Sequence, residues 1–312
     1  MAVFLGAVIP AIVFRVAQQC LLSERPEEEL QQPQQEVTQI SSKRTIPVLL
    51  QNAAVEMMDI DAYITAVVLA EMPAEFEPEA LKAQAVVART YALKRVTTGN
   101  KHPQGAVCTD AACCQAFCAN AESSQSKEVI AKVKNAVQLT CDQVLTYGGN
   151  LIEATYFSCS GGRTEDAVAV WGEEIPYLQS VESPGEENAA HYVDTVSFEA
   201  EAFCEKIGRE LTGMPAEWIG EMTYTTGGGV DTIYIADEPY SGVQIRSLLG
   251  LRSTAFWITA AGDTITVTTK GYGHRVGMSQ YGADAMAAQG HTYQEILNHY
   301  YPDTVLQTWS YN

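Results

Sequence analysis

Glu71 is the residue of this sequence best placed for acid–base chemistry. It lies seven residues after Ile64 and three and four residues after Val68 and Val67, so it continues the apolar stripe of a predicted helix. A buried position at the negative end of a helix disfavours the charged form of a carboxylate. A glutamate in that position is suited to donate a proton near neutral pH. The alternative is a glutamate that reaches solvent past the last helical turn.

Further polar side chains lie on the next predicted helix, over residues 78–99. Lys82 and Arg89 are seven residues apart and share one face, while Gln84 and Tyr91 share an adjacent face. Two cations can offset charge or bind a polar ligand, and a tyrosine ring can stack on a sugar. The same spacing is also typical of a solvated basic stripe.

Cysteines and a histidine cluster in the segment that follows. His102, Cys108 and Cys114 are spaced six and six residues apart, outside any helical pattern. Zn²⁺ takes such nitrogen and sulfur ligands in tetrahedral geometry, and three protein ligands leave a fourth position for water or a carboxylate. A disulfide within residues 108–118 is the alternative outside the cell.

Two segments in the second half of the chain carry other candidate groups. Ser158 and Ser160 lie in a Ser-Cys-Ser-Gly-Gly run that lacks the spacing of a nucleophile elbow, so their hydroxyls are expected to bond sugar or backbone in a tight loop. His274 follows glycines that miss the dinucleotide-binding spacing. It is either a structural histidine or part of a substrate groove.

The elements that must position these residues alternate between helices and hairpins. Asp59 or Asp61 caps the first helix, which ends before Pro73, and a capping box starts the last one at Thr292. The predicted strands are 143–147 with 151–157, and 256–259 with 264–269, and the remaining predicted helix covers 279–289. Without regular βαβ units, this order predicts an α+β fold, in which helices and antiparallel hairpins surround a substrate groove.

Composition and charge limit the function classes. The chain has 312 residues, of which 46% are apolar, and 19 Lys and Arg against 38 Asp and Glu give a net charge of −19. Such an acidic surface without a basic patch argues against nucleic-acid binding. The globular part is expected over residues 46–312, after a stalk over 23–45 that is rich in Gln, Glu and Pro and has almost nothing to bury.

The first 22 residues predict a membrane anchor. Thirteen uncharged residues, 2–14, precede Arg15 and a second apolar turn. The run is short for a spanning helix, and a cleaved signal peptide is the alternative. Either places the rest of the chain outside the cytoplasm. We expect a single-pass protein of the cell membrane whose globular domain is extracytoplasmic.

Three sequence blocks resemble the stage II sporulation protein D family. They are residues 71–73 with 79–93, residues 156–164 and residues 273–283, which follow in the family's order and span nearly the whole globular part. The sequence departs from the family at Cys159, where Thr or Ser is usual, and at Arg275, where Gly is common.

The resemblance implies a peptidoglycan lytic transglycosylase. In that family one Glu, matched here by Glu71, protonates the glycosidic oxygen between N-acetylmuramic acid (MurNAc) and N-acetylglucosamine (GlcNAc), then helps deprotonate the C6 hydroxyl that closes an anhydro ring. The family prefers strands without stem peptides and works with the stage II sporulation protein P amidase during engulfment, between the mother-cell and forespore membranes. The residues expected to bind substrate or support Glu71 are Lys82, Gln84, Arg89, Tyr91, Ser158, Ser160, His274, Ser279, Gln280 and Tyr281.

The resemblance also bears on the metal. It favours Zn²⁺ in a mainly structural role. It also favours Cys114 over Cys113 as the third ligand, because residues 114–117 match the family's Cys-Gln-Ala-aromatic pattern. Two other functions stay open at this point. One is a non-catalytic peptidoglycan-binding module of the amidase-enhancer kind, and the other is a zinc-dependent cell-wall amidase or peptidase.

Overall fold

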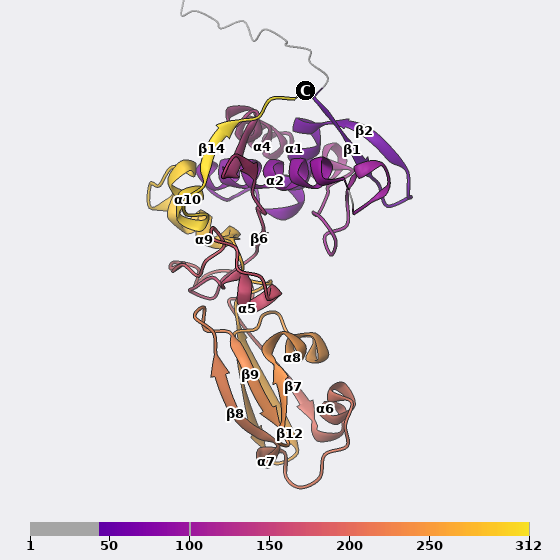
Figure 1. The fold of residues 1–312 in the computed structure, drawn as a ribbon, viewed down its shortest axis with the longest axis vertical. Helices are drawn as coiled ribbons and strands as arrows, with labels where there is room; N and C mark the ends of the chain where they lie inside the picture. The colour runs from indigo at the N-terminus through magenta and orange to yellow at the C-terminus, as the bar shows by residue number, and fades with distance from the viewer. Residues whose placement is uncertain (1–43, 100, 312) are drawn as a thin grey trace, which may run out of the picture. The chain divides into compact units, whose positions relative to one another are not determined.

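A computed structural model describes residues 44–99 and 101–311 of the chain. The predicted anchor over 1–22 lies outside these residues, as does nearly all of the predicted stalk over 23–45. Within the described ranges, no helix combines the length and the apolar content that crossing a bilayer requires. The elements form a mixture of helices and small, mostly antiparallel sheets, which confirms the α+β prediction (Figure 1).

The first hydrophobic core is built around helix α2 (Pro78–Thr98), whose residues 80–93 are mostly buried. Helices α1 (Ile60–Glu71) and α4 (Lys127–Leu139) pack against it. The first helix begins as predicted, because the Asp59 carboxylate accepts a hydrogen bond from the Ala62 backbone N–H at 3.0 Å. The second ends as predicted at Gly99, which adopts the left-handed conformation with φ of 63°.

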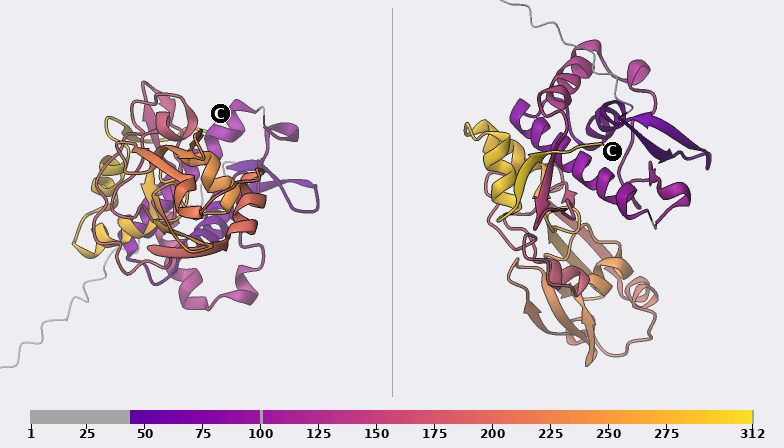
Figure 2. Two further views of the ribbon diagram at one scale, coloured as in Figure 1. Left: turned by 90° about the horizontal axis from the view of Figure 1, so that it is seen from below. Right: turned by 45° about the horizontal axis from the view of Figure 1, so that its top comes forward.

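Helices α9 (Gln280–Ala288) and α10 (Tyr293–Tyr300) contact α2 from the far end of the sequence. Thr292 and Glu295 form the predicted capping box at the start of α10. Figures 1 and 2 show these C-terminal helices, in yellow, beside the N-terminal helices, in purple. The first core is therefore completed only by residues that come late in the chain. The shorter helical segments are η1 (Pro103–Gly105), α3 (Ala121–Ser124) and α5 (Ala167–Trp171).

Small sheets border this core. Their strands are β1 (Thr45–Leu49), β2 (Val55–Asp59), β3 (Val107–Cys108), β4 (Gln143–Tyr147), β5 (Asn150–Leu151), β6 (Tyr156–Phe157), β13 (Met278–Ser279) and β14 (Val305–Thr308). The antiparallel pairing of β4 with β5 confirms the predicted hairpin, but its second strand is not continuous over 151–157, since β5 ends at Leu151. The chain then enters β6, which pairs in parallel with β13 and so joins two segments about 120 residues apart.

A second hydrophobic core lies in residues 193–270, which we call the insert. Its elements are β7 (Val193–Glu199), α6 (Ala200–Ile207), α7 (Pro215–Trp218), β8 (Ile219–Tyr224), β9 (Val230–Ile235), β10 (Glu238–Ser241), α8 (Gly242–Leu249), β11 (Phe256–Ala261) and β12 (Thr264–Lys270). They form two antiparallel sheets, β10-β9-β8 and β11-β12-β7. The predicted hairpin over 256–269 is confirmed as β11 and β12, and Val193 pairs with Lys270, so the insert begins and ends at neighbouring points.

Candidate active site

Glu71 is the last residue of α1, and its half-buried carboxylate is held by two donors. Its Oε1 accepts a hydrogen bond from the Ala116 backbone N–H at 2.7 Å and another from the Tyr156 hydroxyl at 3.1 Å. The alternative, in which this side chain reaches solvent past the last helical turn, is therefore not what the structure shows. Two fixed donors orient one carboxylate oxygen, and no other described residue donates a hydrogen bond to the second, which can face a ligand.

The donors of Glu71 belong to a longer chain of hydrogen bonds. The Gln115 amide donates to the Tyr156 hydroxyl at 3.1 Å, and its carbonyl oxygen accepts from the Tyr63 hydroxyl at 3.2 Å. Burial, and secondly the charge of Glu71, raises the pKa of Tyr156 well above its ordinary value. Tyr156 therefore keeps its proton near neutral pH and acts as a donor to the carboxylate.

A pocket opens beside Glu71, and Gln280 is its most informative polar residue. Gln280 is only 5% exposed, and its amide nitrogen has no hydrogen-bond partner among the described residues. A buried donor without a partner costs free energy, so a ligand acceptor in the pocket would restore what folding leaves unsatisfied. Other residues lining this pocket are Tyr91, Cys114, Tyr156, Phe157, Ser158, Tyr272, Gly273 and His274.

His274 lies on the wall of this pocket in an uncharged form. Burial, and secondly the nearby positive charge of Arg246, lowers its pKa to about 4. Its Nδ1 accepts a hydrogen bond from the Val276 backbone N–H at 3.1 Å, so the neutral ring carries its proton on Nε2. The rings of Phe157 and Trp171 each lie 5.6 Å from the His274 ring. The structure thus brings His274 to the groove as a neutral donor between aromatic rings.

Tyr91 also reaches this pocket, whereas its predicted companions on α2 do not. The Lys82 ammonium pairs with Glu79 at 2.5 Å, and Glu79 in turn accepts the Tyr293 backbone N–H at the start of α10. Lys82 therefore ties α2 to α10 and is not among the residues that line the Glu71 pocket. The Arg95 guanidinium stacks on the Tyr91 ring, 4.6 Å from the ring centre.

Arg89 and Gln84 were predicted to bind substrate or support Glu71 from the surface of the helix. The structure corrects this, because both residues are 0% exposed. The Arg89 guanidinium donates to the Thr140 carbonyl at 2.8 Å and pairs with Asp61 at 3.2 Å. It joins α2, α1 and the turn between α4 and β4, so it cannot bind a sugar. Its position on the predicted basic face was correct, but α4 and β4 cover that face.

The Ser158–Gly162 loop divides its hydroxyls between the pocket and the interior. Ser158 lines the pocket, as expected. Ser160 is 0% exposed, its hydroxyl donates to Glu186 at 2.8 Å, and it accepts a hydrogen bond from the Gly162 backbone N–H at 2.9 Å. Of the two predicted partners, Ser160 therefore bonds the backbone and does not reach a sugar. The same Glu186 oxygen accepts from the Ser160 backbone N–H at 2.7 Å and from the Cys159 thiol at 3.1 Å. Cys159 thus supplies the donor that a Thr or Ser hydroxyl would give.

Ser279 and Tyr281 support the loop from α9. Ser279 is fully buried and caps α9, and its hydroxyl also contacts the Ser158 carbonyl at 3.4 Å. The Tyr281 backbone N–H donates to the same carbonyl at 3.0 Å, while its ring packs on Phe76 at 4.9 Å. Neither side chain lines the pocket, so the expected sugar contact is replaced by a role in positioning Ser158.

Arg275 explains its own departure from the family pattern. Its φ is 66°, a conformation that glycine adopts freely and other residues rarely do. Contacts of the buried guanidinium offset the cost of this conformation. The guanidinium pairs with Glu165 at 3.1 Å and donates to the carbonyls of Ser160 and Gly227 at 2.7 Å. These bonds connect the Ser158–Gly162 loop to a turn of the insert.

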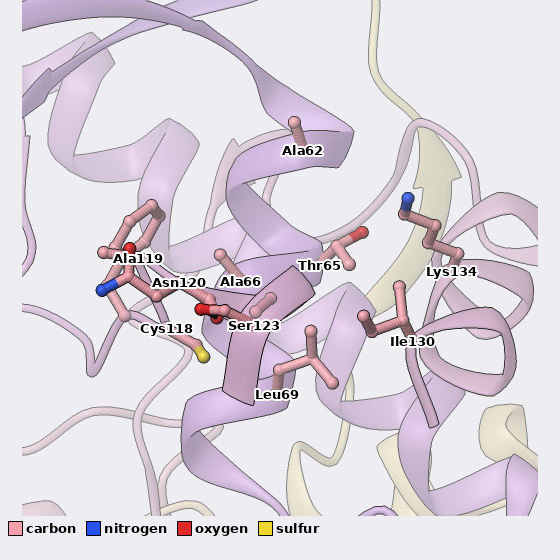
Figure 3. A pocket seen from close by; sticks show the side chains of 12 residues that line it. Ala62, Thr65, Ala66, Leu69, Cys118, Ala119, Asn120, Ser123, Ile130 and Lys134 are labelled. Atoms are coloured by element: carbon pink, nitrogen blue, oxygen red, sulfur yellow. Dashed lines mark hydrogen bonds between the residues drawn. The ribbon is translucent and has the colours of Figure 1, made fainter. Parts of the chain in front are cut away.

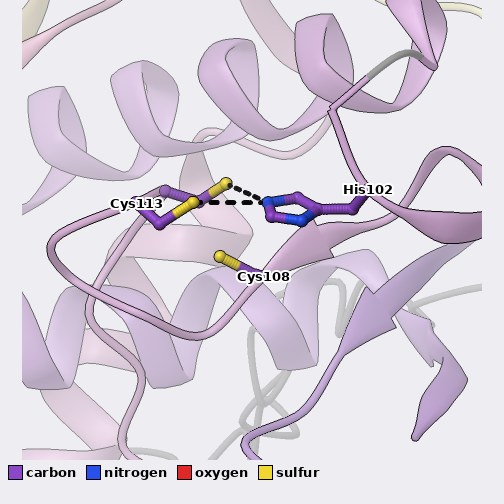
Figure 4. Close-up of side chains that lie close together, drawn as sticks. His102, Cys108 and Cys113 are labelled. Carbon is purple, nitrogen blue, oxygen red and sulfur yellow. Dashed lines mark hydrogen bonds between the residues drawn. The ribbon is translucent and has the colours of Figure 1, made fainter. Parts of the chain in front are cut away.

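The predicted metal ligands converge, and a fourth residue joins them. His102, Cys108, Cys113 and Cys114 place their ligand atoms within 4.8 Å of one another, which is a candidate metal centre (Figure 4). The His102 Nε2 lies 3.4 Å from the Cys113 sulfur and 3.5 Å from the Cys114 sulfur. All seven cysteines of the described residues have free thiols, and Cys118 lies outside the centre. The donor set fits a tetrahedral thiolate and imidazole metal site.

The metal centre and the Glu71 site share one loop. Cys114 lines the Glu71 pocket, Gln115 holds Tyr156, and Ala116 donates its backbone N–H to Glu71. A metal bound by Cys113 and Cys114 would therefore fix the backbone that orients the carboxylate.

A separate pocket lies between α1, α4 and the 117–123 segment (Figure 3). Figure 3 shows mainly apolar and small side chains along its wall, with the Lys134 ammonium at one side. No carboxylate is among the described residues that line it. This pocket therefore offers none of the acid–base groups found at Glu71.

Several functional residues were missed from the sequence. Tyr156 stands inside one of the matching blocks, yet its hydroxyl was not singled out, and Gln115 was noted only as part of a pattern. Cys113 was set aside in favour of Cys114. The signal that could have suggested four ligands was the presence of three cysteines, two of them adjacent, within twelve residues of His102.

Together, these observations define an α+β protein with one hydrogen-bonded carboxylate in an aromatic pocket and a His/Cys₃ centre beside it. A profile described as SpoIID, stage II sporulation protein, matches residues 51–147. Stage II sporulation protein D of Bacillus subtilis (strain 168) is 41% identical over 261 residues, covering 81% of this chain and 76% of the relative. Its counterpart in Bacillus amyloliquefaciens is 40% identical over 258 residues, covering 80% and 74%.

The chain therefore belongs to the stage II sporulation protein D family, as its three sequence blocks predicted. It is also 30% identical over 295 residues to a Bacillus subtilis (strain 168) protein named amidase enhancer, which covers 77% of this chain and 39% of that relative.

Proposed function

We propose that this protein is a lytic transglycosylase that cleaves peptidoglycan glycan strands during sporulation, with Glu71 as its single acid and base. The observation that carries the proposal is the geometry of Glu71. It is the only carboxylate among the described residues that line its pocket, and two donors fix its Oε1. Ordinary glycoside hydrolases need two carboxylates, so a single one favours a reaction in which the sugar supplies its own nucleophile.

The proposed reaction consumes no water. Protonated Glu71 gives its proton to the glycosidic oxygen as the bond from MurNAc C1 to that oxygen breaks. The C6 hydroxyl oxygen of the same MurNAc then bonds to C1, and its proton passes to the Glu71 carboxylate. This closes the 1,6-anhydro ring and restores the acid. The Ala116 N–H and the Tyr156 hydroxyl stabilise the carboxylate while the proton is away.

The remaining pocket residues suit a sugar ligand. Aromatic rings such as Tyr91 offer apolar faces for pyranose rings, and Gln280 and Ser158 offer polar contacts. His274, neutral and protonated on Nε2, can donate to a sugar oxygen without adding charge beside Glu71.

The decisive experiment compares purified protein with its Glu71→Gln variant on isolated peptidoglycan. Anhydro-muramic products should appear with the first and fall by a factor of about 10²–10⁴ with the second. Glu75→Gln, at an exposed glutamate in the next loop, is the matched control and should keep full activity. Circular dichroism must show that Glu71→Gln is folded. A folded Glu71→Gln protein that releases anhydro products at the original rate would refute the proposal.

A second candidate function is a non-catalytic peptidoglycan-binding module, which the similarity to a protein named amidase enhancer favours. It predicts that the purified protein binds glycan and forms no anhydro product.

The zinc-dependent amidase is less well supported. With Cys113 as a fourth ligand, the coordination sphere would be closed and would leave no position for a reactive water.

Zn²⁺ is the proposed metal of the His102, Cys108, Cys113 and Cys114 centre. When bound, it would supply a structural crosslink, because four protein ligands are typical of structural zinc. The link to Glu71 comes from the chain itself. Cys114 lies two residues before Ala116, whose backbone N–H donates a hydrogen bond to the Glu71 carboxylate. Elemental analysis of protein purified without chelator should find about one zinc per chain, and its absence would refute this assignment.

The proposed setting follows the family and the predicted N-terminal anchor. The protein would be held in the cell membrane by a single span, with residues 46–312 in the space between mother cell and forespore. There it would act together with the stage II sporulation protein P amidase. Fractionation should find tagged protein in the membrane, with its C-terminal domain open to external protease. Recovery in the cytosol would contradict this placement.

A further inference from the structure

A second hollow lies on the insert and adjoins the Glu71 pocket. Tyr272 lines both, and the Gly273 backbone N–H, next to it in the pocket wall, donates to the Arg252 carbonyl at 3.0 Å. We call this hollow the insert groove. Its lining residues include Asp194, Arg246, Ser247, Arg252, Thr269 and Tyr272. A strand bound at Glu71 could therefore continue past Tyr272 into the insert groove.

Two arginines of the insert groove differ in how their charge is satisfied. Arg252 pairs with Asp194 at 2.9 Å, and its guanidinium lies 4.8 Å from the Tyr272 ring centre. Arg246, on α8, has no carboxylate within 4 Å among the described residues. The one hydrogen bond of its side chain to the described residues is the long contact from Nε to the Leu251 carbonyl, at 3.4 Å.

Arg246 is thus a half-buried cation that faces a groove and lacks a counter-charge. Burial lowers its pKa, but arginine stays charged near neutral pH. Its charge also contributes to the lowered pKa of His274, which places it near the Glu71 pocket. In a chain of net charge −19, an unpaired arginine at such a place is a specific attraction for an anion.

The neighbouring ring indicates what kind of anion fits. Tyr272 is 40% exposed. The Arg252 guanidinium lies 4.8 Å from its ring centre and the His191 ring stands nearly perpendicular to it at 5.8 Å, so two neighbours hold the ring while its exposed part can receive a flat apolar surface. A ligand that stacks on Tyr272 and pairs with Arg246 must combine a pyranose ring with a carboxylate. In peptidoglycan, muramic acid has this combination whenever its lactyl group is not linked to a peptide.

We propose that Arg246 binds the free lactyl carboxylate of a muramic acid seated on Tyr272, next to the cleavage site. This inference rests on the proposed function, since it assumes that the groove binds peptidoglycan glycan. An amide link to a stem peptide removes the negative charge and adds bulk. Arg246 would therefore make the insert select strands whose lactyl groups are free.

The test measures binding, so that it does not depend on turnover. Glu71→Gln protein is titrated calorimetrically with a GlcNAc–MurNAc tetrasaccharide with free lactyl groups, with the same sugar after methylamidation of its carboxylates, and with chitotetraose. Adding Arg246→Gln should weaken binding of the free tetrasaccharide about 10- to 100-fold, the effect of one charge-assisted hydrogen bond. Binding of the two uncharged sugars should not change.

Two further variants make the result specific. Lys206→Gln removes an exposed cation from α6, which does not line the groove, and should leave all three affinities unchanged. Arg246→Lys keeps the charge and should recover part of the lost affinity, which also guards against a folding defect in Arg246→Gln.

The outcomes separate this inference from the proposed function. Unchanged binding of the free tetrasaccharide by Arg246→Gln, or an equal loss for all three sugars, would overturn the role of Arg246 and leave the transglycosylase standing. If none of the sugars binds even with Arg246 present, the proposed function fails together with the inference.

Discussion

Replacing Tyr156 by phenylalanine tests whether the hydrogen bond to Glu71 matters for the reaction. The change removes one hydroxyl, which donates to the Glu71 carboxylate at 3.1 Å and accepts from Gln115. A hydrogen bond to a charged group contributes about 1.5–3 kcal/mol. If the carboxylate that forms during proton transfer loses this amount, kcat should fall by a factor of about 10–150.

The effect should appear in kcat and leave KM nearly unchanged, because Tyr156 holds Glu71 and phenylalanine keeps the ring that lines the pocket. The assay is release of anhydro-muramic ends from isolated peptidoglycan over a range of substrate concentrations. Tyr147→Phe, at a half-exposed ring on β4, is the control and should behave like the unchanged protein. A folded Tyr156→Phe protein with kcat within twofold of the original would refute the reasoning.

Three other predictions concern stability and metal binding. Because the pKa of His274 is lowered to about 4, the unfolded chain takes up its proton first as pH falls below about 6.5, so about 2 kcal/mol of stability should be lost by pH 5. Urea unfolding at pH 5 and 8 should show this loss reduced in His274→Asn. Glu165→Gln removes the carboxylate that pairs with the buried Arg275 guanidinium and should cost about 3–5 kcal/mol in urea unfolding, whereas Glu182→Gln, at an exposed pair, should cost under about 1 kcal/mol. Cys113→Ser should weaken zinc binding in a chelator competition, while Cys118→Ser should not; equal affinities would remove Cys113 from the centre.

The sequence predicted those features whose cause is local. Asp59 caps α1, the break before Pro73 ends it at Glu71, and Gly99 stops α2, because each of these effects acts within one helical turn. The hairpin of β11 and β12 was predicted for the same reason, because a hairpin joins neighbouring segments. These local signals were enough to place Glu71 at a helix end.

What could not be predicted depends on segments far apart in the chain. Tyr156 reaches Glu71 from a two-residue strand that exists only because it pairs with β13, and so short a strand has no periodicity to detect. Arg89 had the spacing of a surface cation, but the turn after α4 buries it. Cys113 joins Cys114 in the metal centre because both lie in one tight turn at Asp110, whose carbonyl accepts both backbone N–H groups.

The pairing of Val193 with Lys270 has a consequence for how the chain folds. Helices α9 and α10 must reach α2 across the whole insert, and closing so long a loop of unfolded chain is entropically costly and slow. The insert has its own hydrophobic core, so it can collapse first and bring its two ends together. For the rest of the chain it then acts as a short turn. A defect confined to the insert would consequently delay assembly of the first hydrophobic core, even where no residue near Glu71 is altered.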